Sequence, residues 1–356
     1  MESKDIHIVG ARPNFIKAGP VIQALDDLGY KPVVVHTGQH YDAELSEIFF
    51  RQLGIPEPDV NLGIGSGSHA GQTAALMTAI EVALLEHEPH RVVVYGDINS
   101  TLAASVVASK LGIEVAHVEA GLRSFDRTMP EEINRIVTDV LSTLHFATSP
   151  EAVDQLASEG IERERVHFVG NPMIDTLLRF RDMLDVNAAR AAHGLPTRYA
   201  VATIHRPSNV DDPRVAKGLV TGLSQVAKLV PILLPLHPRG WQTLTEAGLM
   251  DVPGIKVVAP IGYIEFMALM AGAALVLTDS GGIQEETTVL GIPCLTLRDN
   301  TERPITISMG TNVLVGADPE RILAAADRFL RDPPVGAIPP LWDGSAGLRV
   351  AQILAV

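Results

Sequence analysis

The chain has 356 residues, of which 46% are hydrophobic and 20% charged, and its formal net charge is −14. This length suggests two domains, and no uncharged apolar stretch is long enough to span a membrane. The acidic balance argues against a nucleic-acid-binding protein, which needs a basic face. Met1–Asp5 leads directly into a strand pattern, so we expect no signal peptide. The single cysteine, Cys294, excludes an internal disulfide and favours a cytoplasmic protein.

Apolar runs alternate with helical patterns along the first half of the chain. The runs are continuous, which is typical of parallel strands that are covered on both faces. The predicted strands are Ile6–Gly10, Pro32–Thr37, Arg91–Gly96, Glu114–Glu119, Leu144–Thr148 and Val166–Gly170. The predicted helices include Pro20–Leu28, Ala43–Leu53, Gly71–Glu86 and Thr101–Leu111.

The second half repeats this alternation after a boundary near Asn171-Pro172. Its predicted strands are Ala200–Ile204, Pro231–Leu236, Lys256–Ala259, Ala274–Thr278, Cys294–Leu297 and Asn312–Val315. Its predicted helices are Arg214–Leu229, Tyr263–Met270, Ile283–Leu290, Pro319–Arg331 and, at the end, Ser345–Leu354. We therefore predict an α/β protein with two doubly wound, Rossmann-like domains, residues 1–170 and 171–340, that face a central cleft.

A turn after the strand Ala274–Thr278 has the features of an anion site. It reads Asp279-Ser280-Gly281-Gly282 and opens a helix. The glycines allow a ligand to approach the backbone, and the helix start offers free N–H groups and a positive dipole end. This predicts a phosphate or diphosphate site, with Glu286 one turn later available to a sugar diol. The alternative is an ordinary strand-to-helix turn.

Two basic residues, Arg12 and Lys17, follow the first strand at the start of a helix. Their segment, Gly10–Lys17, lacks the glycines of a dinucleotide-binding fingerprint, so nicotinamide binding is not expected. Cations at a helix start oppose the helix dipole, and a bound phosphate is a natural compensation. The alternative is a pair of surface residues.

Three carboxylates fall at the predicted carboxyl ends of strands or at the helix that follows. They are Asp97, Glu119 and Glu131. Alone, Asp97 could cap a helix, and Arg135 could form an i,i+4 ion pair with Glu131. Together the three predict an acid–base set at the rim of one domain.

The second domain contributes further polar residues at strand ends. His205 and Arg206 follow its first strand and are expected to face Arg12 across the cleft, although a single histidine is more often structural. Thr301, Glu302 and Arg303 follow a later strand and are expected to close over a sugar phosphate. The sequence shows no zinc or magnesium spacing and no P-loop.

These motifs, taken in order along nearly the whole chain, resemble the non-hydrolysing UDP-N-acetylglucosamine 2-epimerase family. The resemblance rests on Gly10–Lys17, Thr37–His40, Gly96-Asp97, His117–Arg123, Pro130–Arg135, Gly170-Asn171, His205-Arg206, Asp279–Glu286 and Thr301–Pro304. It implies the fold called glycosyltransferase-B, a final helix that returns to the first domain, no cofactor, and a homodimer in which Gly71–Leu85 is a candidate contact. Tyr41-Asp42 departs from the basic pattern of an allosteric site found in many bacterial relatives.

The resemblance also implies roles for individual residues. UDP binding is implied for Ser280, Gly281, Gly282, Glu286, Arg12, His205, Phe266 and Arg303. Catalysis is implied for Asp97, Glu119 and Glu131, and Lys17, Arg135 and His205 are placed in the catalytic set with them. The implied reaction interconverts UDP-GlcNAc and UDP-ManNAc through anti elimination of UDP, a trapped 2-acetamidoglucal and re-addition. Our assignment takes Asp97 as the base, with Glu119 serving the opposite face and Glu131 orienting or protonating.

Four alternatives share the same framework. The first is a 2-epimerase of a related UDP sugar, UDP-2,3-diacetamido-glucuronate or UDP-glucose. The second is a glycosyltransferase of the same fold, which needs an acceptor. The third is a protein that binds a UDP sugar without chemistry, and the fourth is an epimerase that hydrolyses its substrate.

Overall fold

The computed structural model describes residues 5–38 and 57–356, apart from the side chain of Arg12. The chain divides into two compact units. Unit 1 comprises residues 1–179 and 340–356, and unit 2 comprises residues 180–339. The helix predicted over Ala43–Leu53 lies outside the described residues.

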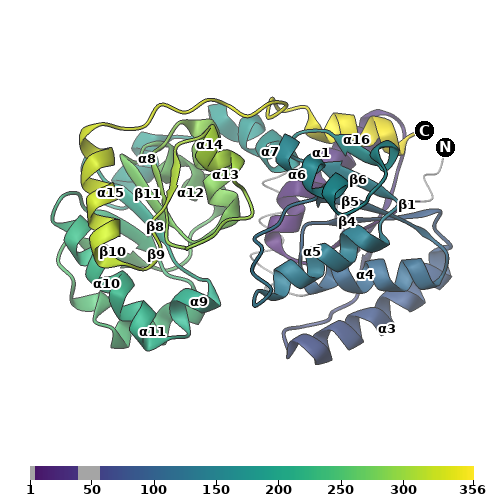
Figure 1. Ribbon diagram of the computed structural model, residues 1–356, viewed down its shortest axis with the longest axis horizontal. Helices are drawn as coiled ribbons and strands as arrows, with labels where there is room; N and C mark the ends of the chain where they lie inside the picture. The colour runs from purple at the N-terminus through teal and green to yellow at the C-terminus, as the bar shows by residue number, and fades with distance from the viewer. Residues whose placement is uncertain (1–4, 39–56) are drawn as a thin grey trace. The chain divides into compact units, whose positions relative to one another are not determined.

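In the described part of unit 1, seven parallel strands form one sheet in the order β3-β2-β1-β4-β5-β6-β7. The strands are β1 (Asp5–Val9), β2 (Val33–His36), β3 (Val60–Asn61), β4 (Arg91–Tyr95), β5 (Glu114–Ala120), β6 (Leu144–Ala147) and β7 (Val166–Phe168). The helices are α1 (Arg12–Asp27), α3 (His69–His87), α4 (Asn99–Lys110), α5 (Pro130–Leu141), α6 (Pro150–Ser158), α7 (Pro172–Phe180) and α16 (Ala346–Leu354), with a 3-10 turn at Arg163–Arg165. Helices α1 and α16 cover one face of this sheet, and α3, α4 and α5 lie on the other (Figure 1).

The core of unit 1 explains why its strands are continuous apolar runs. Every residue of β1 and β4 is buried, because helices cover both faces of the sheet. On one face, Ile8 and Val94 pack with Leu76 and Ile80 of α3. Most positions on both faces of these strands are therefore apolar, and the buried polar exceptions are Asp5, His7 and Arg91.

Unit 2 has a six-stranded parallel sheet in the order β10-β9-β8-β11-β12-β13. The strands are β8 (Ala200–Thr203), β9 (Ile232–Pro235), β10 (Ile255–Val258), β11 (Leu275–Thr278), β12 (Cys294–Thr296) and β13 (Asn312–Leu314). The helices are α8 (Val186–Ala192), α9 (Pro207–Val210), α10 (Pro213–Ala227), α11 (Trp241–Glu246), α12 (Tyr263–Ala271), α13 (Gly281–Leu290), α14 (Ile305–Ser308) and α15 (Pro319–Arg331), with 3-10 turns at Arg181–Met183, Pro238–Gly240 and Leu249–Asp251. The predicted fold class, α/β with two doubly wound units, is confirmed.

Helix α1 begins at Arg12, so the start predicted at Pro20 is wrong. Pro13 is tolerated in the first turn, where a missing N–H costs nothing. The side chain of Asn14 accepts hydrogen bonds from the amides of Gly10 and Ala11, which fixes the chain entering the helix. Pro20 then lies inside the helix and removes the N–H that the carbonyl of Ile16 would accept.

The carbonyl of Ile16 is satisfied by a residue far along the chain. The hydroxyl of Thr176, on α7, donates to it over 2.7 Å. Thr176 is buried, so bulk water does not compete for this hydrogen bond. The interior proline of α1 is thus compatible with a regular helix only because α7 packs beside it.

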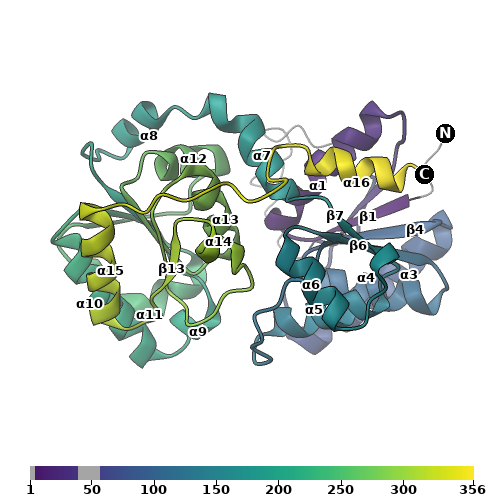
Figure 2. The ribbon, with the colours of Figure 1, turned by 45° about the horizontal axis from the view of Figure 1, so that its top comes forward.

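The last helix, α16, lies along α1 (Figure 2). A Cβ atom on Gly347 would come within 2.7 Å of the backbone of Pro20, so the two helices approach as closely as glycine allows. Before this helix, the buried indole of Trp342 donates to the carbonyl of Thr148 over 2.8 Å. These contacts explain why residues 340–356 belong to unit 1.

The hydrogen bond from Thr176 to the carbonyl of Ile16 leads to a prediction about the stability of a double mutant. Thr176→Val should lower the free energy of unfolding by roughly 1–3 kcal/mol, because a buried carbonyl loses its donor. In a Pro20→Ala background the helix regains its own N–H at position 20, so the cost of Thr176→Val should shrink. Urea unfolding of the wild type, the two single variants and the double variant measures the coupling between the two sites. Strictly additive losses of unfolding free energy would show that Thr176 does not replace the missing N–H of Pro20.

Candidate active site

The polar side chains of unit 1 gather at the carboxyl ends of β1, β4 and β5. The strand order reverses between β1 and β4, because β2 lies on the far side of β1. Ligands of open α/β sheets bind at such a switch point. Gly96 and Asp97 directly follow β4, Glu119 is near the end of β5, and Lys17 is on the helix after β1.

Lys17 and Glu119 form a buried ion pair at this edge, with 8% and 4% of their side chains exposed. Gly96 lies directly against the pair, since a Cβ atom there would meet the Oε2 atom of Glu119 at 2.9 Å and the Nζ atom of Lys17 at 3.1 Å. Glu119 itself has a φ of +76°, an uncommon value for a residue with a side chain. Backbone strain of this kind often marks a functional site.

Asp97 and Arg135 form a second ion pair. The Oδ2 atom of Asp97 accepts from Nε and Nη2 of Arg135 over 2.9 Å and 2.6 Å. The N-cap position of α4 is held by Ile98, so the alternative in which Asp97 caps this helix is not observed. Arg135 also donates to Glu132 over 2.6 Å within α5, while its bonds to Asp97 link α5 to the chain that follows β4.

Of the other predicted site residues in unit 1, the structure describes the side chain of Glu131 but not that of Arg12. Glu131 is half-buried in the first turn of α5, one turn before Arg135. Arg12 is the first residue of α1, and its side chain is outside the described residues. The described residues also exclude Gln39 and His40, which end the family motif Thr37–His40, and the pair Tyr41-Asp42, which departs from the allosteric pattern.

Three supporting residues of unit 1 were not predicted as site residues. Asn14 donates to the carbonyl of Tyr95 over 2.8 Å, and Asn134 donates to that of Asp97 over the same distance. Glu132 accepts from the amides of Ser124 and Phe125. All three bond to backbone, which no spacing in the sequence reveals.

The polar residues of unit 2 gather at the ends of β8, β11 and β12, again where the strand order reverses. Asp279, which is fully buried, holds this edge together. Its Oδ2 atom accepts from the amides of His205 and Arg206, each over 2.9 Å. Its Oδ1 atom lies 2.8 Å from Nδ1 of His205. Although burial raises the pKa of Asp279, His205 lowers it below its usual range, so the carboxylate stays ionised and orients the imidazole.

Helix α13 begins at Gly281, with Ser280 as its N-cap. No side-chain hydrogen bond from Ser280 caps the helix, so its first N–H groups are available to a ligand. A Cβ atom on Gly281 would come within 2.3 Å of Arg303, which explains the first glycine of the pair. Arg303 is buried and lies 3.0 Å from Glu285, and it also pairs with Glu302. The turn Ser280-Gly281-Gly282 therefore has a guanidinium beside it.

Glu286 lies one turn into α13 and is buried. Burial raises its pKa to about 8, and the hydroxyl of Tyr263, 3.1 Å away, opposes the shift. Tyr263 and the half-buried Phe266 lie on α12, which packs against α13. Tyr263 was not predicted as a site residue, because its role depends on this packing.

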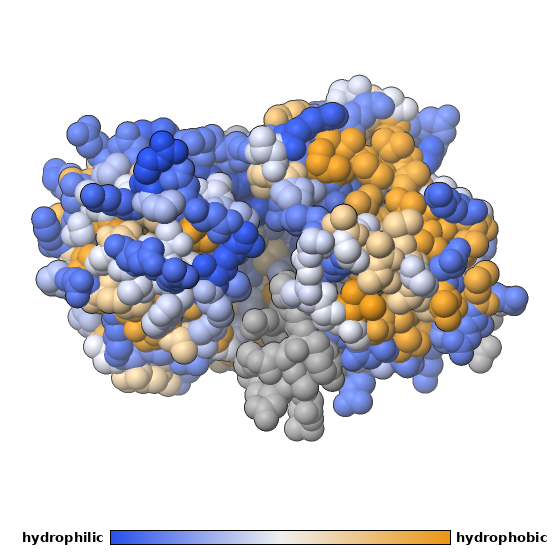
Figure 3. Space-filling view, turned by 90° about the horizontal axis from the view of Figure 1, so that it is seen from below, coloured by the Kyte–Doolittle hydropathy of each residue, from blue (hydrophilic) through white to orange (hydrophobic). Residues whose placement is uncertain are grey.

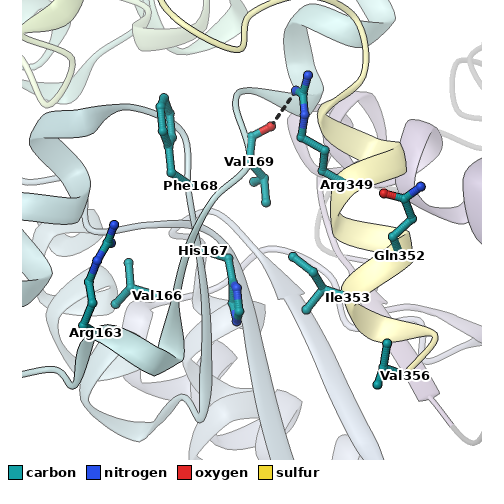
Figure 4. A pocket seen from close by; sticks show the side chains of 9 residues that line it. All are labelled: Arg163, Val166, His167, Phe168, Val169, Arg349, Gln352, Ile353 and Val356. Carbon is teal, nitrogen blue, oxygen red and sulfur yellow. Dashed lines mark hydrogen bonds between the residues drawn. The ribbon is translucent and has the colours of Figure 1, made fainter.

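Residues 5–38 and 57–356 contain no group of three or more histidine, cysteine, aspartate or glutamate side chains placed to hold a metal ion. No helix in that part of the chain is long and apolar enough to cross a membrane. An open depression of about 710 Å³ lies between β7 and α16, and none of the predicted site residues lines it (Figure 4).

The chain is similar over nearly its whole length to proteins of known function. A family model described as UDP-N-acetylglucosamine 2-epimerase matches residues 23–355. The UDP-N-acetylglucosamine 2-epimerase of Methanocaldococcus jannaschii is 43% identical over 98% of this chain and 97% of its own. The UDP-2,3-diacetamido-2,3-dideoxy-D-glucuronate 2-epimerase of Pseudomonas aeruginosa is also 43% identical, over 99% of both chains. The crystal structure of the Methanocaldococcus jannaschii enzyme with UDP-GlcNAc and UDP matches with a TM-score of 0.93 and 42% identity, covering 100% of this chain and 99% of the other.

Two doubly wound units and these relatives place the chain among the α/β enzymes of the UDP-sugar isomerase class. The chain belongs to the UDP-N-acetylglucosamine 2-epimerase family. This confirms the resemblance that the ordered motifs indicated.

The raised pKa of Glu286 predicts how stability depends on pH. In the folded protein this carboxyl stays protonated up to about pH 8, whereas in the unfolded chain it ionises near its ordinary pKa of 4.5. Stability should therefore fall as pH rises from about 4.5 to about 8, by up to about 1.4 kcal/mol per pH unit from this group.

Thermal unfolding of wild type and Glu286→Gln at several pH values tests this. The variant, which has no proton to lose, should show a flatter dependence of Tm on pH between 6 and 8. Equal slopes for the two proteins would show that Glu286 is ionised in the fold.

Proposed function

We propose that the protein interconverts UDP-GlcNAc and UDP-ManNAc without hydrolysing either. The observation that carries this proposal is the presence of two different polar sites, each at the switch point of its own sheet. The site of unit 2 suits a diphosphate, and the site of unit 1 suits proton transfer. The proposal is supported by the relative of that name at 43% identity over nearly the full length.

In this proposal the residues of unit 2 bind UDP. The turn at the start of α13 donates its N–H groups to the diphosphate, where the helix dipole and the neighbouring cations favour negative charge. Glu286 accepts hydrogen bonds from the ribose, and Phe266 flanks the uracil. The residues assigned to UDP are Ser280, Gly281, Gly282, Glu286, Phe266, His205 and Arg303, together with Arg12 of unit 1.

The residues of unit 1 move the proton at C2. The bond between C1 and the UDP oxygen breaks, UDP leaves with the electron pair, and a carboxylate removes the C2 proton. The resulting 2-acetamidoglucal is protonated at C2 on the opposite face as UDP adds back to C1. We assign Asp97 as the base, Glu119 as the group on the opposite face, and Glu131 as the residue that orients or protonates.

Lys17 and Arg135 assist these carboxylates. Each holds one acid in place through an ion pair, Lys17 with Glu119 and Arg135 with Asp97. Positioned acid–base groups typically contribute a factor of about 10²–10⁴ to a rate. Stabilisation of the departing diphosphate supplies the other large contribution.

Asp97→Asn should lower the epimerisation rate by at least about 100-fold, because the amide cannot accept the C2 proton. Proton NMR of UDP-GlcNAc turnover in deuterated water measures both the rate and the entry of deuterium at C2. Asp154→Asn, which changes an exposed acid on α6, is the matched control and should behave as wild type.

Two results would count against this assignment. Near-normal turnover by Asp97→Asn would remove Asp97 from the role of base. Epimerisation by wild type without deuterium at C2 would exclude exchange of the C2 proton altogether.

A second candidate substrate is UDP-2,3-diacetamido-glucuronate. The observation that favours it is the equal identity, 43%, to the Pseudomonas aeruginosa enzyme of that specificity. Incubation with UDP-GlcNAc, UDP-glucose and UDP-2,3-diacetamido-glucuronate in parallel decides between the candidates. We expect UDP-GlcNAc to have the highest kcat/KM.

We also propose that the protein is a homodimer that pairs through the outer face of α3. Val82 and Leu85 on this helix are 62% and 61% exposed, and Val140 on α5 is 64% exposed. These helices flank α4, and apolar side chains gather over this region of unit 1 (Figure 3). An apolar area of this kind is typical of an interface, and two copies can bury it by twofold symmetry.

Val82→Glu combined with Leu85→Glu should convert the dimer into a monomer, because two carboxylates would be buried at the interface without partners. Sedimentation velocity measures the mass. The matched control is Leu229→Glu, at an exposed leucine of unit 2, which should leave the mass unchanged. A dimer that persists in the double variant would place the interface elsewhere.

The cellular setting is part of the proposal. The thiol of Cys294 is buried, and burial raises its pKa to about 12, so it is an inert core residue compatible with a reducing cytoplasm. We assign the protein to the cytoplasm, with a ManNAc-containing surface polysaccharide as the destination of its product.

A further inference from the structure

His117, on β5, contacts an acceptor with each of its two ring nitrogen atoms. Nδ1 lies 2.6 Å from Oδ1 of Asp139, and Nε2 lies 2.8 Å from the carbonyl oxygen of Gly96. The side chain is fully buried. A peptide carbonyl oxygen can only accept a hydrogen bond, so the Nε2 atom must carry a proton.

The Nδ1 atom faces the carboxylate of Asp139. Burial raises the pKa of Asp139, but His117 and Arg123 together hold it below its usual range. Its second oxygen, Oδ2, accepts from the amide of Gly121 over 3.1 Å and lies 2.7 Å from Nη1 of Arg123. The carboxylate thus lies against the His117 ring on one side and against two donors on the other, and this geometry favours a proton on Nδ1 of His117 as well as on Nε2.

The His117 ring contacts the backbone that lies beside both ion pairs of unit 1. Gly96, whose carbonyl it binds, has a φ of +62° and lies against Lys17 and Glu119. The next residue is Asp97, and Glu119 follows His117 by two positions on the same strand. A shift of the Gly96 peptide would therefore move Asp97 and disturb the contact with the Lys17–Glu119 pair.

We propose that His117 is a positioning residue for epimerisation, in which its doubly protonated ring fixes the Gly96-Asp97 peptide and thereby the Asp97 carboxylate. The inference rests on the proposed role of Asp97 as the base. His117 acts through Gly96, while Asp139 and Arg123 keep the buried cation balanced by charge.

Neutron diffraction from deuterium-exchanged crystals of the wild-type protein tests the protonation directly. Deuterons on both Nδ1 and Nε2 of His117 are expected at pH 7.5. A deuteron on only one of the two nitrogens would overturn the proposal. This measurement needs neither activity nor a variant, so it does not depend on the proposed function.

Kinetics of His117→Gln test the positioning role. Glutamine is neutral and cannot donate to both acceptors, so the Asp97 carboxylate should lose its alignment. We expect kcat to fall roughly tenfold to a hundredfold, the usual cost of a small misplacement, while KM and the calorimetric affinity for UDP stay within about twofold. A folded variant with wild-type kcat would overturn the proposal, and so would an equal loss in UDP affinity.

His145→Gln is the matched control. His145 is also fully buried, lies on the neighbouring strand β6, and its Nε2 atom is 2.8 Å from the backbone oxygen of Asp139. Because its bonds go to the backbone of Asp139 and Arg165 and not to Gly96, its loss should lower Tm and leave kcat within about twofold. If wild type epimerises no UDP sugar, the proposed function fails, while the neutron map still decides the state of His117.

Discussion

The polar edge of unit 1 depends on how closely Gly96 approaches the ion pair between Lys17 and Glu119. A Cβ atom at this position would meet the Oε2 atom of Glu119 at 2.9 Å and the Nζ atom of Lys17 at 3.1 Å, so a larger residue would require the pair to shift. The pair is largely buried, and Gly96 after β4 lies against Glu119 of β5. Buried ion pairs contribute little net stability, so this arrangement is better explained by the geometry it imposes than by any gain in folding energy.

Unit 2 also uses a buried charged group to hold its polar edge, but this group is an anion. In unit 1, the cations Lys17 and Arg135 pair with the carboxylates of Glu119 and Asp97. In unit 2, the buried carboxylate of Asp279 contacts the His205 ring and accepts from two backbone amides. Each unit thus uses a buried counter-charge to fix polar groups at the edge of its sheet. Such local arrangements are how the proposed function reconciles a net charge of −14 with a diphosphate site.

The sequence predicted the positions of the strands well and the first residues of the helices less well. Continuous apolar runs identified the strands, because both faces of each sheet are covered. Helix α1 was started too late because Pro20 was taken as a beginning, and the donor that makes it tolerable, Thr176, lies far along the chain. Among site residues, those proposed to face a ligand lie in recognisable turns after strands. Those that support them, such as Asn14, Asp139 and Tyr263, become visible only when strands and helices are packed together.

The bond from Thr176 to the carbonyl of Ile16 also decides where this protein can be divided. The hydroxyl lies on α7, beyond the predicted boundary at Asn171-Pro172, and the chain that covers α1 from its other side returns only after residue 339. A fragment that stops at the end of β7 would leave an unsatisfied peptide group in the middle of its first helix and an apolar groove beside it. Separate expression of the first lobe therefore requires residues 172–179 and the last seventeen residues to be spliced onto it.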